Sequence, residues 1–159
     1  MLFMNLFHKN LFIFYKMELK IINYGGIEYQ KMTELRTKIL RKPLGLTFTE
    51  EYLQSDRDDI LMACVEGEEM IGCCILTIID TSTIQLKQIA VLDAFQKQGI
   101  GTRLVELAEM IAKEKSINTI TLHARKVVTD FYLKLGYIIE GEEFVEVNIP
   151  HLQMTKVLD

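Results

Sequence analysis

The residues with the clearest chemical potential lie in a short segment, Gln96-Lys97-Gln98-Gly99-Ile100-Gly101. An apolar strand is predicted just before it, and from Gly99 the apolar spacing predicts a helix reaching about Lys115. Glycines at such a junction let the backbone approach a ligand closely and leave successive N–H groups unpaired. Together with the positive end of the helix dipole, these donors suit an anion such as a diphosphate.

Two other kinds of glycine loop do not match this segment. It lacks the Gly-Lys-Ser/Thr of a Walker P-loop and the GxGxxG fingerprint of a dinucleotide-binding turn. A glycine turn that only permits close packing of the strand against the helix is an alternative interpretation. Lys97 and Arg103 could add positive charge to an anion site.

A second motif follows after the next predicted strand: Asp130-Phe131-Tyr132-Leu133-Lys134-Leu135-Gly136-Tyr137. The helix carrying Phe131 and Tyr132 is expected to end at Gly136, which suits a left-handed C-cap.

With both motifs in this order, the chain from Met17 to Asp159 resembles the GCN5-related N-acetyltransferase (GNAT) family. The family motif Q/R-x-x-G-x-G/A matches Gln96, Gly99 and Gly101, and its later F-Y-x-x-L-G-F/Y segment matches Phe131, Tyr132, Leu135, Gly136 and Tyr137. The closing GEEFVEVNIPHLQMTKVL is similar to the tails of small bacterial ElaA-type members. There, Asn148 replaces a familiar glycine.

The resemblance implies transfer of an acetyl group from acetyl-CoA to a primary amine of a small molecule, by direct attack on the thioester. It implies that backbone groups of Ile89, Ala90 and Val91 hold the pantetheine arm and that a backbone N–H near Val91 stabilises the oxyanion. Tyr132 matches the general acid that protonates the leaving thiolate. The implied acetyl-CoA-binding residues are Ile89, Ala90, Val91, Gln96, Lys97, Gln98, Gly99, Ile100, Gly101 and Thr102.

The general base is not identified by the motifs. Gln85 stands where some members carry a glutamate, and an amide does not usefully accept the proton. His123 and His151 are candidates because imidazole can titrate near neutrality; a water chain ending on a carboxylate is another. Arg125 stands where the family often has an asparagine that helps hold the pantetheine, and it could reach a phosphate instead.

The acceptor is expected to bind along the segment RTKILRKPLGL, residues 36–46. Arg36 and Arg41 are interpreted mainly as solvated surface residues, with recognition of a substrate carboxylate as the alternative. Two other functions remain open: acetylation of a protein or peptide, and a non-catalytic acyl-CoA-binding regulatory module.

The expected elements alternate in type. Strands are predicted at 17–23, 60–65, 70–79, 83–92, 119–123, 137–147 and 153–157, and helices at 27–40, 49–53, 99–115 and 127–135. This order predicts a mixed α/β domain whose sheet cannot be purely parallel because it contains hairpins. The resemblance sharpens this to a mixed, mostly antiparallel central sheet flanked by helices.

Composition limits the partners. The chain has 159 residues and a formal net charge of −4, which disfavours general nucleic-acid binding. Its three cysteines form no zinc-like cluster, and their odd number suggests reduced thiols in the cytoplasm.

Residues 17–159 are expected to form a single domain. Residues 1–16 are interpreted as an extension or an upstream start-codon choice, with no membrane span or signal peptide; an apolar arm packed on the domain or on a partner is the alternative. Dimers are common in the family, so a homodimer is one expected assembly.

Overall fold

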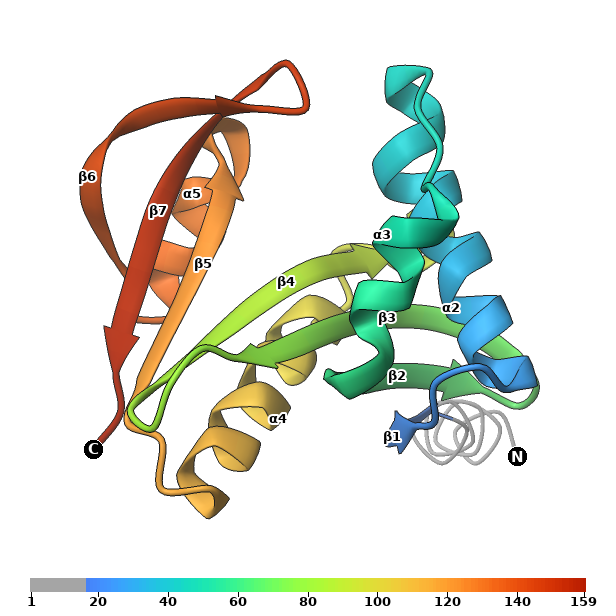
Figure 1. Cartoon of the computed structure of the whole chain (residues 1–159), viewed down its shortest axis with the longest axis horizontal. Coiled ribbons are helices and arrows are strands. Elements are labelled where there is room, and N and C mark those ends of the chain that lie inside the picture. Colours follow the sequence, from blue (N-terminus) through green and yellow to red (C-terminus); the bar gives the residue numbers. More distant parts are fainter. Residues whose placement is uncertain (1–16) are drawn as a thin grey trace, which may run out of the picture. The chain divides into compact units, whose positions relative to one another are not determined.

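The computed structural model describes residues 17–159, and the expectations for residues 1–16 lie outside the described part of the chain (Figure 1). Seven strands form one mixed, mostly antiparallel sheet with the order β1-β2-β3-β4-β5-β7-β6. The strands are β1 (Met17–Ile22), β2 (Ile60–Glu66), β3 (Glu69–Ile78), β4 (Thr83–Val91), β5 (Thr119–Arg125), β6 (Ile138–Glu146) and β7 (Ile149–Val157). The α-helices are α2 (Ile27–Arg36), α3 (Glu50–Gln54), α4 (Ile100–Glu114) and α5 (Thr129–Lys134). The predicted fold class is confirmed.

Contacts divide the described chain into two compact units. The first contains the described residues up to Cys74 together with Gln88–Leu104, and the second contains Ile75–Lys87 together with Val105–Asp159. Strands β3 and β4 and helix α4 contribute residues to both units.

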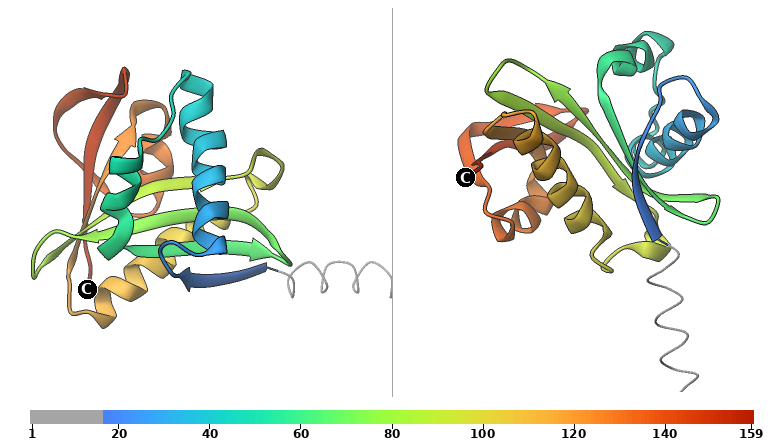
Figure 2. Two further views of the ribbon diagram at one scale, coloured as in Figure 1. Left: turned by 45° about the vertical axis from the view of Figure 1, so that its right-hand side comes forward. Right: turned by 90° about the horizontal axis from the view of Figure 1, so that it is seen from below.

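In the first unit, α2 and α3 lie on one face of the strands and the first turn of α4 lies on the other (Figure 2). Met32 and Leu35 of α2 are buried with the central residues of β2 and β3, which are apolar on both faces. A strand that is covered on both faces is typically a continuous run of apolar residues. The sequences ILMACV in β2 and MIGCCIL in β3 are such runs. Thr49 caps the N-terminus of α3, because its hydroxyl accepts the Tyr52 N–H at 3.1 Å.

The predicted helix over 27–40 is correct only in part. The α-helix ends at Arg36, and the chain continues as a π-helix over Thr37–Arg41 and a 3-10 turn over Lys42–Leu44. Pro43 sits at the start of that short turn, where its missing N–H costs nothing.

In the second unit, β5 pairs in parallel with β4 and antiparallel with β7, and β6 and β7 form a hairpin. Val147 and Asn148 at the hairpin tip both have positive φ, 47° and 61°, as a type I′ turn requires. Asparagine tolerates this conformation, which explains how Asn148 can stand where relatives of the ElaA type carry glycine.

Strand β7 begins four residues earlier than predicted, at Ile149, and so includes Pro150. Strand β5 ends at Arg125, opposite His151, so Pro150 has a strand neighbour only on the β6 side, where it faces Val145. A proline is tolerated at such a place because no ladder hydrogen bond is lost. Across residues 17–159, no helix is both long enough and apolar enough to cross a membrane.

Candidate active site

The Gln96–Gly101 loop belongs to the first unit and is tied to the end of β4. The Gln96 side-chain amide donates to the Val91 carbonyl and to Asp93 Oδ1, each at 3.1 Å. Gln98 donates to the Ala94 carbonyl at 3.2 Å. The two glutamines therefore hold the loop through their side chains, and the Gln96 N–H also donates to the Asp93 carbonyl, at 3.3 Å.

Gly99 is needed for its backbone conformation and not for packing. Its φ is +81°, and a Cβ built on it would meet no atom within 4 Å. The alternative of a packing glycine is therefore wrong for this position. The first bond of α4 runs from the Arg103 N–H to the Gly99 carbonyl at 3.0 Å, so the N–H groups of residues 100–102 precede the helical ladder. These donors, at the positive end of a fifteen-residue helix, fit a diphosphate.

Close packing of strand and helix instead depends on Gly72 in β3. A Cβ on Gly72 would lie 2.9 Å from Ile100 Cγ2 and 3.4 Å from Leu104 Cδ1. Ile100 and Leu104 are both buried in the first turns of α4. The missing side chain of Gly72 thus sets how near the start of α4 lies to the sheet.

The strand segment Ile89–Val91 continues beyond the pairing of β4 with β5. The register between these strands runs from Thr83–Thr119 to Leu86–Leu122, whereas β4 extends to Val91. Gln88, just before this segment, has a φ of 55°, which interrupts regular strand geometry. On the other side, the Leu92 N–H donates to the Ile71 carbonyl of β3 at 2.9 Å. Hydrogen bonding of the pantetheine arm by residues 89–91 stays a prediction.

Arg36 is fully buried, so its interpretation as a solvated surface arginine is wrong. Its Nη1 lies 2.8 Å from Asp56 Oδ2, and its Nε donates to Gln88 Oε1 at 3.3 Å. The Tyr29 hydroxyl also donates to Asp56 Oδ2, at 2.8 Å. Burial, followed by this hydrogen bond to Asp56, raises the pKa of Tyr29 to about 12. The network links α2 and the turn after α3 to the irregular residue of β4.

Arg41 is half-buried and stacks on an aromatic pair. Its guanidinium carbon lies 4.5 Å from the centre of the Phe48 ring and 5.9 Å from that of Tyr52. The Arg36 guanidinium lies 4.6 Å from the same Phe48 ring. The Tyr52 hydroxyl in turn accepts from Gln88 Nε2 at 3.1 Å. The predicted acceptor segment and Gln88, the irregular residue of β4, are therefore joined by side chains.

Tyr132 belongs to the second unit, where α5 buries it to 5% exposure. Its ring meets those of Phe131 and Tyr137 edge-on, with centroids 4.9 and 5.9 Å away. Gly136 has a φ of +90°, and the Tyr137 N–H donates to the Tyr132 carbonyl at 3.1 Å, which confirms the predicted left-handed cap. The FYLKLGY motif thus packs around Tyr132; the role of Tyr132 as general acid stays a prediction.

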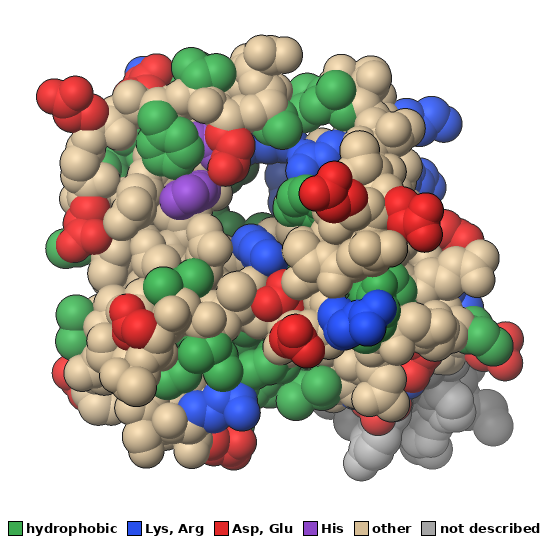
Figure 3. All heavy atoms as spheres, in the orientation of Figure 1, with side chains coloured by type: hydrophobic (Ala, Val, Ile, Leu, Met, Phe, Trp, Pro, Cys, Tyr) green, Lys and Arg blue, Asp and Glu red, His purple; other side chains and the backbone are tan. Residues whose placement is uncertain are grey.

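The two candidate bases, His123 and His151, are brought together by the second unit. Both ring systems approach the carboxylate of Glu146, a residue that the sequence did not single out. Figure 3 shows histidine side chains beside acidic ones over the β5–β7 part of the surface. Gln85, on β4 opposite Thr121, offers only an amide.

Cys64, Cys73 and Cys74 are free and buried in β2 and β3. Burial raises the pKa of the Cys73 thiol to about 12 and that of Cys74 well above its usual value. A thiol that stays protonated is a poor nucleophile, so these residues do not supply the chemistry.

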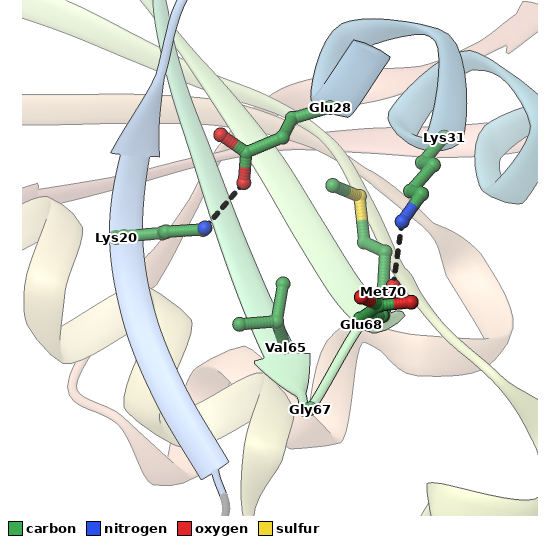
Figure 4. Close-up of a pocket in the computed structure, with 7 residues that line it drawn as sticks. All are labelled: Lys20, Glu28, Lys31, Val65, Gly67, Glu68 and Met70. Atoms are coloured by element: carbon green, nitrogen blue, oxygen red, sulfur yellow. Dashed lines mark hydrogen bonds and ion pairs between the residues drawn. The ribbon is translucent and has the colours of Figure 1, made fainter.

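A pocket of about 300 Å³ opens between β1, α2 and the β2–β3 turn (Figure 4). Lys20 pairs there with the Glu28 carboxylate, and Lys31 donates to the main-chain carbonyl of Glu68 at 2.7 Å. None of the motif residues lines this pocket, whose walls are Lys20, Glu28, Lys31, Val65, Gly67, Glu68 and Met70.

Within residues 17–159, no group of three or more histidine, cysteine or acidic side chains is arranged to hold a metal ion.

Comparisons with known proteins identify the family. Residues 29–158 match the model of the acetyltransferase (GNAT) domain. The YyaT protein of Bacillus subtilis (strain 168) is 42% identical over 74 residues, which are 46% of this chain and 50% of that protein. The chain thus matches about half the length of this curated relative.

Solved structures with the same fold cover nearly the whole chain. Escherichia coli ElaA superposes with a TM-score of 0.75 at 16% identity, covering 87% of this chain and 99% of ElaA. A GNAT acetyltransferase from Elizabethkingia anophelis, solved with acetyl-CoA bound, gives a TM-score of 0.69 at 23% identity and covers 90% and 99%. Because the family model matches residues 29–158 and both motif regions are in place, this chain belongs to the acetyltransferase (GNAT) domain family.

Proposed function

We propose that this protein is an acetyl-CoA-dependent N-acetyltransferase that acetylates the primary amine of a small molecule. The observation that carries the proposal is the anion cradle at the start of α4, where Gly99 adopts a φ of +81° and three main-chain N–H groups precede the first helical bond. These donors suit the diphosphate of coenzyme A.

Bound acetyl-CoA supplies a thioester that an amine can attack. In this chain, residues 89–91 would orient the pantetheine arm through their backbone, and the N–H near Val91 would stabilise the oxyanion. The Tyr132 hydroxyl would protonate the leaving thiolate. Gly72 and Gln96 support these groups by setting the positions of α4 and the loop.

The proposed acceptor wall is the surface formed by Arg41, Phe48 and Tyr52. A guanidinium that lies over the Phe48 ring, which itself stacks on Tyr52, is held in place and still presents hydrogen-bond donors at its edge. An acceptor that carries a carboxylate or hydroxyl group beside its amine would suit this surface.

Release of the coenzyme A thiol is the test. Purified protein is incubated with acetyl-CoA and, in turn, glucosamine, spermidine, tyramine and a short peptide with a free N-terminus. Turnover on a small amine supports the proposal, and turnover on the peptide alone would assign protein or peptide acetylation instead. Acetyl-CoA binding by calorimetry without release on any amine would indicate a regulatory acyl-CoA-binding module.

The three free, buried cysteines fit a reducing compartment, so we place the protein in the cytoplasm. Tagging the protein and fractionating cells tests the location. Light scattering tests whether it forms a homodimer.

A further inference from the structure

Three neighbouring strands bring two histidines to one carboxylate. His123 on β5 places its Nδ1 3.3 Å from Glu146 Oε1, at the end of β6. His151 on β7 places its Nε2 3.6 Å from Glu146 Oε2. His123 lies outside the quoted family segments, whereas Glu146 and His151 fall in the ElaA-like tail GEEFVEVNIPHLQMTKVL. The three residues are not arranged as a metal site.

The hydrogen bonds assign the proton positions. An ionised carboxylate only accepts hydrogen bonds, so the Nδ1 of His123 carries the proton shared with Glu146. In the neutral ring, Nε2 then holds the free electron pair and is the atom able to take up a proton. This is the arrangement in which a carboxylate orients a catalytic imidazole.

Packing fixes the His123 ring without covering it. Phe144 meets it edge-on, with ring centres 4.9 Å apart and planes at 74°. The His123 side chain nevertheless keeps 34% of its surface exposed. Its strand neighbours Leu122 and Ala124 are buried, so His123 projects from the opposite, open face of β5.

The position of His123 along β5 is also specific. The pairing of β5 with β4 ends at Leu122, opposite Leu86, so His123 is the first residue of β5 beyond that ladder.

His151 is unsuited to the same task. Its Nδ1 lies 2.7 Å from the Ile149 carbonyl, its other nitrogen faces Glu146, and only 4% of the residue is exposed. Since a carbonyl only accepts, Nδ1 is a donor here. The His151 ring also stacks on Phe144, with ring centres 5.9 Å apart, and so packs against the same ring that meets His123 edge-on.

We propose that His123 is the general base of the acetyl transfer and that Glu146 is the residue that positions it. This inference rests on the proposed function and adds to it the group that the motifs leave out. His123 Nε2 takes a proton from the acceptor nitrogen; the nitrogen electron pair forms the new C–N bond to the acetyl carbon. The C–S bond breaks, the thiolate of coenzyme A leaves and is protonated, and His123 returns its proton to solvent.

The charged groups around His123 are few. Glu146 faces it from β6 and His151 from β7, while Arg125 lies two residues along β5 in register with His151. Lys126 pairs with Glu143 of β6 at 2.7 Å, which gives a second, exposed link between the end of β5 and β6. This pair offers a matched control because its removal breaks an exposed ion pair to β6 and leaves the contacts of His123 unchanged.

The test measures kcat/KM against pH, from about 6 to about 9.5, with the best amine of the panel. We expect His123→Gln to lower kcat/KM about 100-fold near pH 7, with a smaller deficit at high pH where the amine deprotonates unaided. Added imidazole should restore part of the activity of His123→Ala. The kcat/KM of Glu146→Gln should fall between the values of wild type and His123→Gln, and the kcat/KM of Lys126→Gln should equal that of wild type. Melting temperature and acetyl-CoA affinity should change little in all four.

Two results would overturn the assignment in distinguishable ways. If wild type turns over and His123→Gln stays within about 3-fold of it at every pH, the base assignment fails and the proposed function stands. If wild type acetylates none of the amines, the proposed function fails and the base assignment with it.

Discussion

Arg36 and Asp56 form an ion pair with 2.8 Å between Nη1 and Oδ2 although neither side chain is exposed to solvent. Removing two charges from water is costly, so such a pair persists only when further hydrogen bonds support it. Tyr29 supplies one to Asp56, and Gln88 accepts one from Arg36. The pair therefore connects α2, the turn after α3 and Gln88, the irregular residue of β4.

Breaking this pair should destabilise the fold strongly. We expect Asp56→Asn to lower the free energy of unfolding by about 3–5 kcal/mol, because the buried Arg36 charge loses its partner. Urea unfolding followed by circular dichroism measures the change. Lys20→Gln, which removes the solvent-screened Lys20–Glu28 pair of the same unit, should change the free energy of unfolding far less. Equal effects of the two variants would contradict the structural role of the buried pair.

Adding one methyl group at Gly72 should disturb the start of α4. Gly72→Ala forces its Cβ against Ile100, which is branched at Cβ and cannot swing away, so we expect a loss of about 1–3 kcal/mol in stability. Acetyl-CoA affinity should fall as well, because the cradle moves with the helix. Gly67→Ala is the control: unlike Gly72, Gly67 has no atom within 4 Å of the position of its Cβ, and its φ of +61° imposes only local strain. Gly72→Ala with unchanged stability and affinity would contradict the close approach.

A negative charge at Gly101 should repel the diphosphate. We expect Gly101→Glu to weaken acetyl-CoA binding at least 10-fold more than Gly101→Gln, which has the same size without the charge. Calorimetric titration at low and high salt measures both. The difference should shrink as salt screens the charge. Equal affinities of the two variants would mean that no anion binds at the start of α4.

Removing the Tyr132 hydroxyl should slow protonation of the leaving thiolate. We expect Tyr132→Phe to reduce kcat about 100-fold with little change in acetyl-CoA affinity, since the ring and its contacts with Phe131 and Tyr137 remain. Steady-state kinetics across pH measures this loss. Phe131→Leu serves as the control for a packing effect. Turnover of Tyr132→Phe equal to that of wild type at every pH would remove the general-acid assignment.

Stability should decline at alkaline pH. The Cys73 pKa is raised to about 12 by burial, so the native state keeps a proton that the unfolded chain loses near pH 8.5. This contribution is fully present below the unfolded pKa and is lost as pH rises towards the folded value. Tyr29, with its pKa also raised to about 12, acts in the same direction. Urea unfolding midpoints of wild type and Cys73→Ala, compared at neutral and alkaline pH, measure how much stability each protein loses as the pH rises. An equal loss in both proteins would contradict the contribution of Cys73.

The features that the sequence determines by itself are those whose causes lie within a few residues. Gly99 and Gly136 adopt positive φ, Thr49 caps its helix and the cysteine-rich strands are buried. Each follows from local backbone sterics or from an apolar run, which a sequence displays directly. The two motifs add the family because their residues sit at fixed spacing.

The tertiary structure decides what depends on residues far apart in the chain. It buries Arg36 against Asp56. It brings the first turns of α4 close to Gly72 of β3. It also ends the pairing of β4 with β5 at Leu86 and Leu122. It also brings Glu146 to His123, which lies 23 positions earlier in the chain. Pairing across strands sets these neighbours, and register depends on the whole sheet, so no local pattern predicts which carboxylate meets which imidazole.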